Sequence, residues 1–243
     1  MKWMLVFGAE SDIAKAVVRR FAKEGVNFYL AHFNIKELED FAKDVSIRYG
    51  VKAVPVTFDA VKYNTHKAFY NKLSPKPDGV LCVFGYLGDN IKAIQDFTEA
   101  ERIIDVNYKG AVSILNIVAH DFMQRKSGWI AAISSVAGDR GRQSNFIYGS
   151  AKGGLSVYLS GLRNFLCKYN VQVLTVKPGF VNTKMTRGLD LPKKLVAEPE
   201  EVAEDIFKAW KKKKDVLYTK WIWRYIMLII IHIPERVFKR LSL

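Results

Sequence analysis

A serine, a tyrosine and a lysine near the middle of the chain have the types and spacing needed to move a proton to or from an oxygen atom. Tyr148 and Lys152 are four residues apart in a segment of helical pattern, so they share one helix face. Ser135 ends an apolar, strand-like run. A phenol is a weak acid, and we expect the Lys152 ammonium to lower its pKa. A serine hydroxyl can hydrogen-bond an oxygen on which charge gathers, so the set predicts acid–base chemistry on a carbonyl or hydroxyl group.

A fourth polar residue, Asn107, interrupts an apolar helical pattern in "IIDVNYKGA". We expect its side chain to hold a water molecule that returns a proton to Tyr148. Each of the four residues has an ordinary explanation when taken alone, such as a serine cap or an asparagine satisfied locally. Their order along the chain and their places on expected strands and helices favour the catalytic interpretation.

These residues must be positioned by a framework of alternating strands and helices. Apolar, β-rich runs alternate with helix-length segments of 3.6-residue period. The runs are apolar on both faces, which predicts an α/β doubly wound parallel sheet, the Rossmann fold, with helices on both sides. The expected strands are "KWMLVF", "VNFYLAHF", "VKAVPVTF", "DGVLCVFG", "GWIAAIS" and "VQVLTVKPG". In a chain of 243 residues without repeat or linker, we expect one reductase domain over 1–218 and an amphipathic helical tail over 219–243.

The turn after the first expected strand lies where such a sheet brings a pyrophosphate to a helix N-terminus. Dinucleotide-binding turns are rich in glycine, yet Gly8 is the one glycine between Phe7 and Ala16. Asp12 and Ala14 stand at two further glycine positions. We expect Asp12 to be the N-cap of a helix that begins at Ile13. The turn alone is equally typical of a plain connection between strand and helix.

With these motifs in place, the chain from Lys2 to about Tyr218 resembles the short-chain dehydrogenase/reductase family. The resemblance implies an NAD(P)-dependent oxidoreductase with the catalytic tetrad Asn107, Ser135, Tyr148 and Lys152. It also implies that Asp59 recognises the adenine amine and that "KPGFVNT" forms the loop on the nicotinamide side. The cofactor-binding residues it implies are Gly8, Ser11, Asp12, Ile13, His32, Phe33, Asp59, Ala60, Gly85, Tyr148, Lys152, Pro178, Gly179, Val181 and Thr183.

The sequence slightly favours NADH over NADPH. His32 and Phe33 stand where the family has an aspartate for the ribose hydroxyls of NAD or an arginine for the phosphate of NADP. Ser11 stands where many users of NADP have a cation. With no cation in place for the 2′-phosphate, NAD is the better match.

The formal net charge of +14 is concentrated at the C-terminus, where residues 208–243 hold ten basic and two acidic side chains. Within this region the run Trp221–Ile233 is apolar except for Arg224 and His232, and it is too short to span a bilayer, which takes about 20 apolar residues. Aromatic rings beside basic residues are typical of a helix that lies on an anionic membrane. The alternative is a tail that packs on the substrate cleft or on a sister subunit. No nucleic-acid-binding module is present in the sequence, so we expect no nucleic acid partner.

The chain is also similar to one bacterial branch of the family, the ketoreductases of the decaprenylphosphoryl-ribose 2′-epimerase system. That resemblance implies a 2-keto furanose on a polyprenyl phosphate as substrate, a flavin-dependent oxidase as partner, and Arg140 and Arg142 as ligands of the phosphate. Two alternatives stay open: a reductase of a soluble ketone or acyl-thioester, and a non-catalytic NAD-binding scaffold. The motifs that carry the similarity are "FGYLGD", "DVNYKGA", "SSVAGDRGRQSNFIYGSAKGG", "PGFVNTKM" and "WRYIMLIIIHIPERVFKRL".

Location and assembly are weaker expectations. The first strand begins directly after Met1, with no charged, apolar and small-residue leader, so we expect a cytoplasmic protein that is peripheral on the inner face of the membrane. Cys82 and Cys167 lie in apolar surroundings, so we expect buried free thiols and neither a disulfide nor a metal site. Analogy with the family favours a homo-oligomer.

Overall fold

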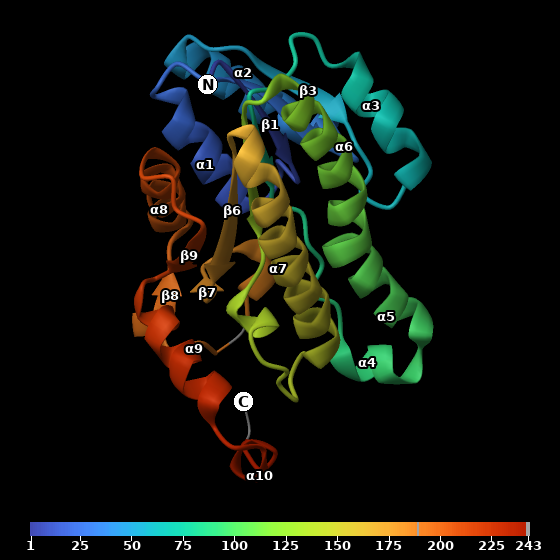
Figure 1. The fold of residues 1–243 in the computed structure, drawn as a ribbon, viewed down its shortest axis with the longest axis vertical. Helices are drawn as coiled ribbons and strands as arrows, with labels where there is room; N and C mark the ends of the chain where they lie inside the picture. Colours follow the sequence, from blue (N-terminus) through green and yellow to red (C-terminus); the bar gives the residue numbers. More distant parts are fainter. Residues whose placement is uncertain (189, 242–243) are drawn as a thin grey trace.

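Parallel strands form the central sheet of the computed structural model, which describes residues 1–188 and 190–241 (Figure 1). The order in this part of the chain is β3-β2-β1-β4-β5-β6-β9, and every neighbouring pair is parallel. The order reverses between β1 and β4, which defines a doubly wound sheet and confirms the predicted fold class. The strands are β1 (Trp3–Phe7), β2 (Asn27–His32), β3 (Ala53–Thr57), β4 (Gly79–Cys82), β5 (Gly128–Ile133), β6 (Val171–Pro178) and β9 (Val216–Thr219).

Helices cover both faces of this sheet, as Figure 1 shows. Alternate residues of β1 enter two different cores: Met4 and Val6 lie in one, and Leu5 and Phe7 lie in the other. A strand buried on both faces needs apolar side chains at every position, which is why the strands read as continuous apolar runs. One face carries α1 (Asp12–Ala22), α2 (Lys36–Tyr49) and α8 (Pro199–Lys211); the other carries α3 (His66–Lys72), α6 (Gly110–Arg125) and α7 (Phe146–Leu166).

Two small features frame the carboxyl edge of the sheet. The helices α4 (Asn90–Gln95) and α5 (Phe97–Ile104) follow β4, and a π-helical turn, Asp105–Lys109, joins α5 to α6. Beyond β6, a pair of two-residue strands, β7 (Phe180–Val181) and β8 (Val196–Ala197), forms a separate ladder. Strands this short have no periodicity, so the sequence pattern did not predict them.

One side of the C-terminal tail packs against the rest of the fold. After β9 the chain forms α9 (Ile222–His232) and α10 (Glu235–Phe238), which extend past the carboxyl edge of the sheet in Figure 1. Trp223 and Met227 are buried against residues of the site loops and of β9. The Trp223 indole lies so close to Gly179 that a Cβ there would be 2.0 Å from it. Its Nε1 donates a hydrogen bond to the Leu195 carbonyl (3.2 Å), so this ring packs inside the fold, as the alternative for the tail had it.

The cysteine prediction is half correct. Cys82 is a buried free thiol on β4, as expected. Cys167 is also free but exposed, because it begins the 3-10 turn Cys167–Tyr169 that ends α7 at the surface. Its apolar neighbours in the sequence therefore do not cover it.

Replacing Trp223 by alanine tests how firmly the tail is anchored. The indole is 3% exposed, so Trp223→Ala should lower the free energy of unfolding by about 3–5 kcal/mol in a urea titration. Trp221→Ala is the matched control, because that indole on the same tail is 72% exposed and its loss should cost about 0.5 kcal/mol or less. Equal effects of the two substitutions would contradict the buried anchor.

Candidate active site

One cavity of about 700 Å³ brings the predicted residues together. It lies at the carboxyl edge of the sheet, where the strand order reverses between β1 and β4. All of the residues predicted to bind the cofactor line it, and so do Ser135 and Arg142. Asn107 and Arg140 do not belong to its lining.

The turn after β1 has the shape of a phosphate cradle in spite of its missing glycines. Gly8 has φ +72°, and a Cβ on it would lie 2.5 Å from the Phe84 backbone nitrogen, so only glycine fits. Ser11 is the N-cap of α1, but its side chain makes no capping hydrogen bond. The first backbone N–H groups of α1 and the positive end of its dipole therefore remain available to an anion in the cavity. These residues fit the pyrophosphate of a dinucleotide.

Asp12 has a different place from the one predicted. It is the first residue of α1 rather than its N-cap, and its carboxylate accepts a hydrogen bond from the Lys184 backbone N–H (2.8 Å). Glu10 forms ion pairs with Lys184 and with Lys15, both at 2.7 Å. Burial raises the pKa of Glu10, but the hydrogen bonds from the two lysines outweigh it and hold the pKa below its ordinary value. Local sequence could not reveal Glu10 as a site residue, since Lys184 is 174 positions away.

At the end of the cavity formed by β2 and β3, the predicted residues His32, Phe33 and Asp59 lie in the lining. Burial lowers the pKa of His32 below its ordinary value, although the charge of Glu37 raises it in part. The charges of Glu10 and Lys15 reach this ring. The Lys15 ammonium is already paired with the Glu10 carboxylate, so it is less available to the 2′-phosphate of NADPH. The slight preference for NADH stays a prediction.

Close backbone contact positions the catalytic serine and tyrosine. Ser135 follows β5, and the 3-10 turn after it, Val136–Gly138, lies against α7. A Cβ on Gly138 would be 2.6 Å from the Gly153 backbone nitrogen, and one on Gly153 would be 2.9 Å from the Gly138 carbonyl oxygen. The two glycines let the turn approach the helix at the level of Lys152. As a result Ser135 lies close enough to the Tyr148 hydroxyl to lower the pKa of the phenol in part.

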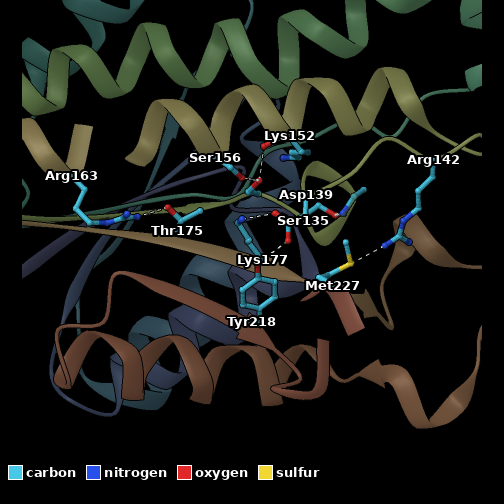
Figure 2. A network of polar contacts seen from close by, with 12 residues as sticks. Ser135, Asp139, Arg142, Lys152, Ser156, Arg163, Thr175, Lys177, Tyr218 and Met227 are labelled. Carbon is cyan, nitrogen blue, oxygen red and sulfur yellow. Dashed lines mark hydrogen bonds and ion pairs between the residues drawn. The ribbon is translucent and has the colours of Figure 1, made fainter. Parts of the chain in front are cut away.

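Hydrogen bonds to the backbone hold the side chains of Ser135, Ser134 and Lys152 in place; Ser135 and Lys152 are labelled in Figure 2. The Ser135 hydroxyl oxygen accepts the Ala137 N–H (3.1 Å), so its own proton is free for the phenol or for a substrate oxygen. The Ser134 hydroxyl donates to the Lys152 carbonyl (2.8 Å) and ties α7 to the end of β5. The Lys152 ammonium donates to the Ile133 carbonyl (3.0 Å).

Burial sets the charge states of Tyr148 and Lys152. It raises the pKa of Tyr148 to about 12, although the hydrogen bond with Ser135 lowers it in part. It lowers the pKa of Lys152 to about 8. The prediction that the pKa of Tyr148 lies below its ordinary value is therefore wrong for the protein alone, because desolvation of the phenol dominates. The phenol is protonated at neutral pH, as an acid in ketone reduction must be, and the ammonium lies 5.7 Å from its ring centre.

Asn107 is buried in the π-helical turn and acts on the loop after β4. Its Nδ2 donates to the carbonyls of Tyr86 (2.6 Å) and Ile103 (2.8 Å), and its Oδ1 accepts the Tyr86 N–H (3.2 Å). Both amide protons are used by backbone carbonyls, so Oδ1 is the atom left to hold the predicted water, and that role stays a prediction. It holds Gly85, where a Cβ would lie 3.0 Å from Asn107 Oδ1 and 3.4 Å from Lys152 Nζ. Asn107 is thus a positioning residue beside the lysine.

A buried carboxylate anchors the loop between Ser135 and Tyr148. Asp139 pairs with the Lys177 ammonium from β6 and accepts a hydrogen bond from the Tyr218 hydroxyl of β9 (2.8 Å), as drawn in Figure 2. Burial and this hydrogen bond raise the pKa of Tyr218 above its ordinary value. The carboxylate thus fixes the loop that carries both predicted phosphate-binding arginines.

The two arginines of this loop have separate places. Arg140 Nη1 donates to the carbonyls of Ile230 (2.6 Å) and Ile233 (2.6 Å) at the end of α9, and its Nη2 pairs with Glu235 (2.9 Å). It therefore caps the tail helix rather than facing a substrate. Arg142 lines the cavity, and its Nη2 contacts the Met227 sulfur at 3.1 Å. Of the two predicted phosphate ligands, only Arg142 lies at the cavity.

Two polar atoms at this end of the cavity are buried without a hydrogen-bond partner among the described residues. One is Arg142 Nε and the other is Asn145 Oδ1. Asn145 is the N-cap of α7, but its side chain makes no capping hydrogen bond. Burial lowers the pKa of Arg142 below its ordinary value, although the charge of Asp139 raises it in part. A buried donor and a buried acceptor without partners in the described chain fit a site that binds a polar ligand. Asn145 was not predicted, because an unused N-cap has no sequence signal.

The comparisons with known proteins agree with this geometry. The family model for short chain dehydrogenases matches residues 2–194. An uncharacterised oxidoreductase of Mycobacterium tuberculosis is 32% identical over 241 residues, which cover 98% of this chain and 96% of the relative. One from Streptomyces coelicolor is 30% identical over 241 residues, covering 98% and 95%. Among solved structures, a short-chain dehydrogenase from Sphingobium yanoikuyae in complex with NADPH superposes with a TM-score of 0.82 at 20% identity, covering 97% of each chain.

Fold and site together define a doubly wound oxidoreductase with a serine, a tyrosine and a lysine in the lining of a cavity that fits a dinucleotide. The chain belongs to the short-chain dehydrogenase family. It is an NAD(P)-dependent enzyme, and the interpretation as a non-catalytic scaffold is set aside.

Removing the phenolic proton tests the acid. Tyr148→Phe should lower kcat for ketone reduction by roughly 10²–10⁴-fold, because the phenol beside Ser135 is the proton donor to the substrate oxygen. Cofactor binding, measured by fluorescence titration, should persist. Tyr158→Phe is the matched control on the same helix, since that hydroxyl bonds Asn116 instead. Unchanged turnover in Tyr148→Phe would refute the assignment.

The pH profile tests Lys152. Its pKa of about 8 means that the ammonium is charged at pH 7 and loses its proton as the pH rises through 8. Tyr148, with a pKa of about 12, stays protonated over the same range. The kcat/KM for reduction should therefore be level below pH 8 and fall roughly tenfold per pH unit above it. A profile that stays level to pH 10, in protein shown to be folded by circular dichroism, would contradict a catalytic lysine charge.

Proposed function

We propose that this enzyme reduces the ketone of a sugar carried on a polyprenyl phosphate and so completes a 2′-epimerisation. The observation that carries the proposal is Arg142, whose half-buried cation lines the cavity with one nitrogen unpaired. An anionic group of the substrate would satisfy that nitrogen with a charge-assisted hydrogen bond. Asn145 Oδ1 offers an acceptor to a sugar hydroxyl on the same side.

The chemistry follows from the charge states of the buried pair. When bound, the reduced nicotinamide supplies the hydride. Ser135 donates a hydrogen bond to the carbonyl oxygen, and Tyr148 gives that oxygen its phenolic proton as negative charge develops there. The Lys152 ammonium, 5.7 Å from the ring centre, stabilises the phenolate that remains. Asn107 keeps the loop at Gly85 in place beside the lysine.

The proposed substrate requires an oxidation before this step. A 2-keto furanose arises when the 2-hydroxyl of the sugar loses two hydrogens, and a flavin-dependent oxidase is the partner that the sequence resemblance implies. The reductase then returns hydride and a proton to the same carbon and oxygen, so the two steps together leave the sugar at its original oxidation level. Only the configuration at that carbon changes.

Neutralising Arg142 tests the anion site. Arg142→Met should raise KM for a phosphate-bearing keto-sugar by roughly 10- to 100-fold, with little change in kcat. This is the loss in affinity expected when one hydrogen bond between charged groups is removed. The matched control is the same variant with the keto-sugar that lacks the phosphate, for which KM should not change. Arg142→Lys should recover part of the loss.

The same assay separates the alternative function. A soluble reductase would turn over simple ketones or acyl-thioesters with a higher kcat/KM than any keto-sugar phosphate. It would also show no preference for a phosphate that depends on Arg142. That result would replace the proposed substrate while leaving the family and the catalytic residues in place.

A further inference from the structure

The outward side of α9 is an apolar surface that no described part of the chain covers. The inward side packs through Trp223, Ile226, Met227 and Ile230. On the opposite side Ile229 is 68% exposed and Leu228 is 55% exposed, together with Trp221, Ile222, Tyr225 and Ile231. A helix that is apolar all round is normally buried all round. An exposed apolar face of this kind is typical of a surface that meets a partner outside the chain.

Basic side chains lie on α9 and on the segments at its two ends, where they outnumber the acidic ones. Arg224 on α9 and Arg236 in α10 are exposed, and Lys239 and Arg240 follow directly. Lys220, at the start of the tail, has one distant carboxylate, that of Glu201 at 3.9 Å. A surface of apolar residues rimmed by cations is complementary to anionic headgroups above acyl chains. A second copy of the chain is a poorer match, since a twofold contact would bring the same cations together.

The geometry of the helix excludes a membrane span. Among the described residues, no helix has both the length and the apolar character needed to cross a bilayer. At about 1.5 Å per residue, α9 is long enough to lie along a surface but not to cross one. Such a helix places its apolar face at the boundary between headgroups and acyl chains.

We propose that the outer face of α9 docks the enzyme on an anionic bilayer, which brings the cavity to the headgroup layer. The inner face of the same helix reaches the cavity, because Met227 contacts Arg142 and Trp223 lies on Gly179. Both of these partners line the cavity. A lipid-linked phosphate would then meet Arg142 without leaving the membrane surface. This last step rests on the proposed function, whereas the docking surface does not.

Vesicle flotation with the full-length protein tests the docking surface without any substrate. Wild type should float with vesicles of phosphatidylglycerol and phosphatidylcholine, and should float much less with phosphatidylcholine alone. The double variant Leu228→Ser, Ile229→Ser should bind at least tenfold more weakly, because several buried methylene groups are lost from each side chain. Val157→Ser is the matched control, since Val157 is 74% exposed on α7 and far from the tail in sequence.

The charged rim is tested in the same assay. Arg236→Gln and Lys239→Gln should each weaken binding about fivefold, the effect of about 1 kcal/mol for a basic residue near an anionic surface. Raising the salt to roughly 1 M, where charges are screened within about 3 Å, should remove the difference between wild type and these variants. Reduction of a small soluble ketone should be unchanged in all of them.

The outcomes are distinct. Wild type that stays at the bottom of the gradient with anionic vesicles, or a double variant that floats like wild type, overturns the docking proposal. A second contrary result is possible in analytical ultracentrifugation. If wild type does not float and is a dimer, while the double variant is a monomer, the face binds a second copy of the chain and the docking proposal is overturned. Flotation together with a soluble ketone as the best substrate would keep the docking surface and reject the keto-sugar phosphate.

Discussion

The close approach of one turn to one helix is the contact on which the active site depends. Gly138 and Gly153 face each other with no room for a Cβ on either, and this contact fixes the distance between β5 and α7 at their carboxyl-edge end. Ser135 belongs to the turn, and Tyr148 and Lys152 belong to the helix. A methyl group at the contact would push the two elements apart and separate the serine from the phenol. The hydrogen bond from the Ser134 hydroxyl to the Lys152 carbonyl joins the same two elements beside this contact.

Burial gives the site its reactivity at a cost in stability. A lysine that is 2% exposed has its pKa lowered to about 8, and a buried tyrosine has its pKa raised to about 12, so both groups are held in the forms needed to begin a reduction. An ammonium in such a place is stabilised by few groups in the protein alone, chiefly the Ile133 carbonyl. Proton donation by the tyrosine creates a negative charge beside it. The buried cation is therefore better stabilised during the reaction than before it.

The tail serves both the fold and the site. Its inner face packs beside Gly179 and contacts the end of Arg142. Arg140 caps α9 and links the loop between Ser135 and Tyr148 to the tail. Asp139 ties that loop back to β6 and β9. A movement of α9 would consequently reach the loop that carries Arg142. The same contacts explain why one of the two arginines on the loop is structural and the other faces the cavity.

The sequence by itself determined the doubly wound sheet, and it predicted a set of residues most of which line one cavity at the carboxyl edge of that sheet. These depend on local signals: apolar runs of strand length, a tyrosine and a lysine one helical turn apart, and a glycine after the first strand. Tertiary structure alone decided the direction of the pKa shifts, the division of labour between Arg140 and Arg142, the ion pair of Glu10 with Lys184, and the burial of Trp223 beside the exposed Trp221. The reason is physical. Desolvation, ion pairing and the choice of which helix face is covered depend on groups that are distant in the chain, and no periodicity or spacing in the sequence reports which of them meet.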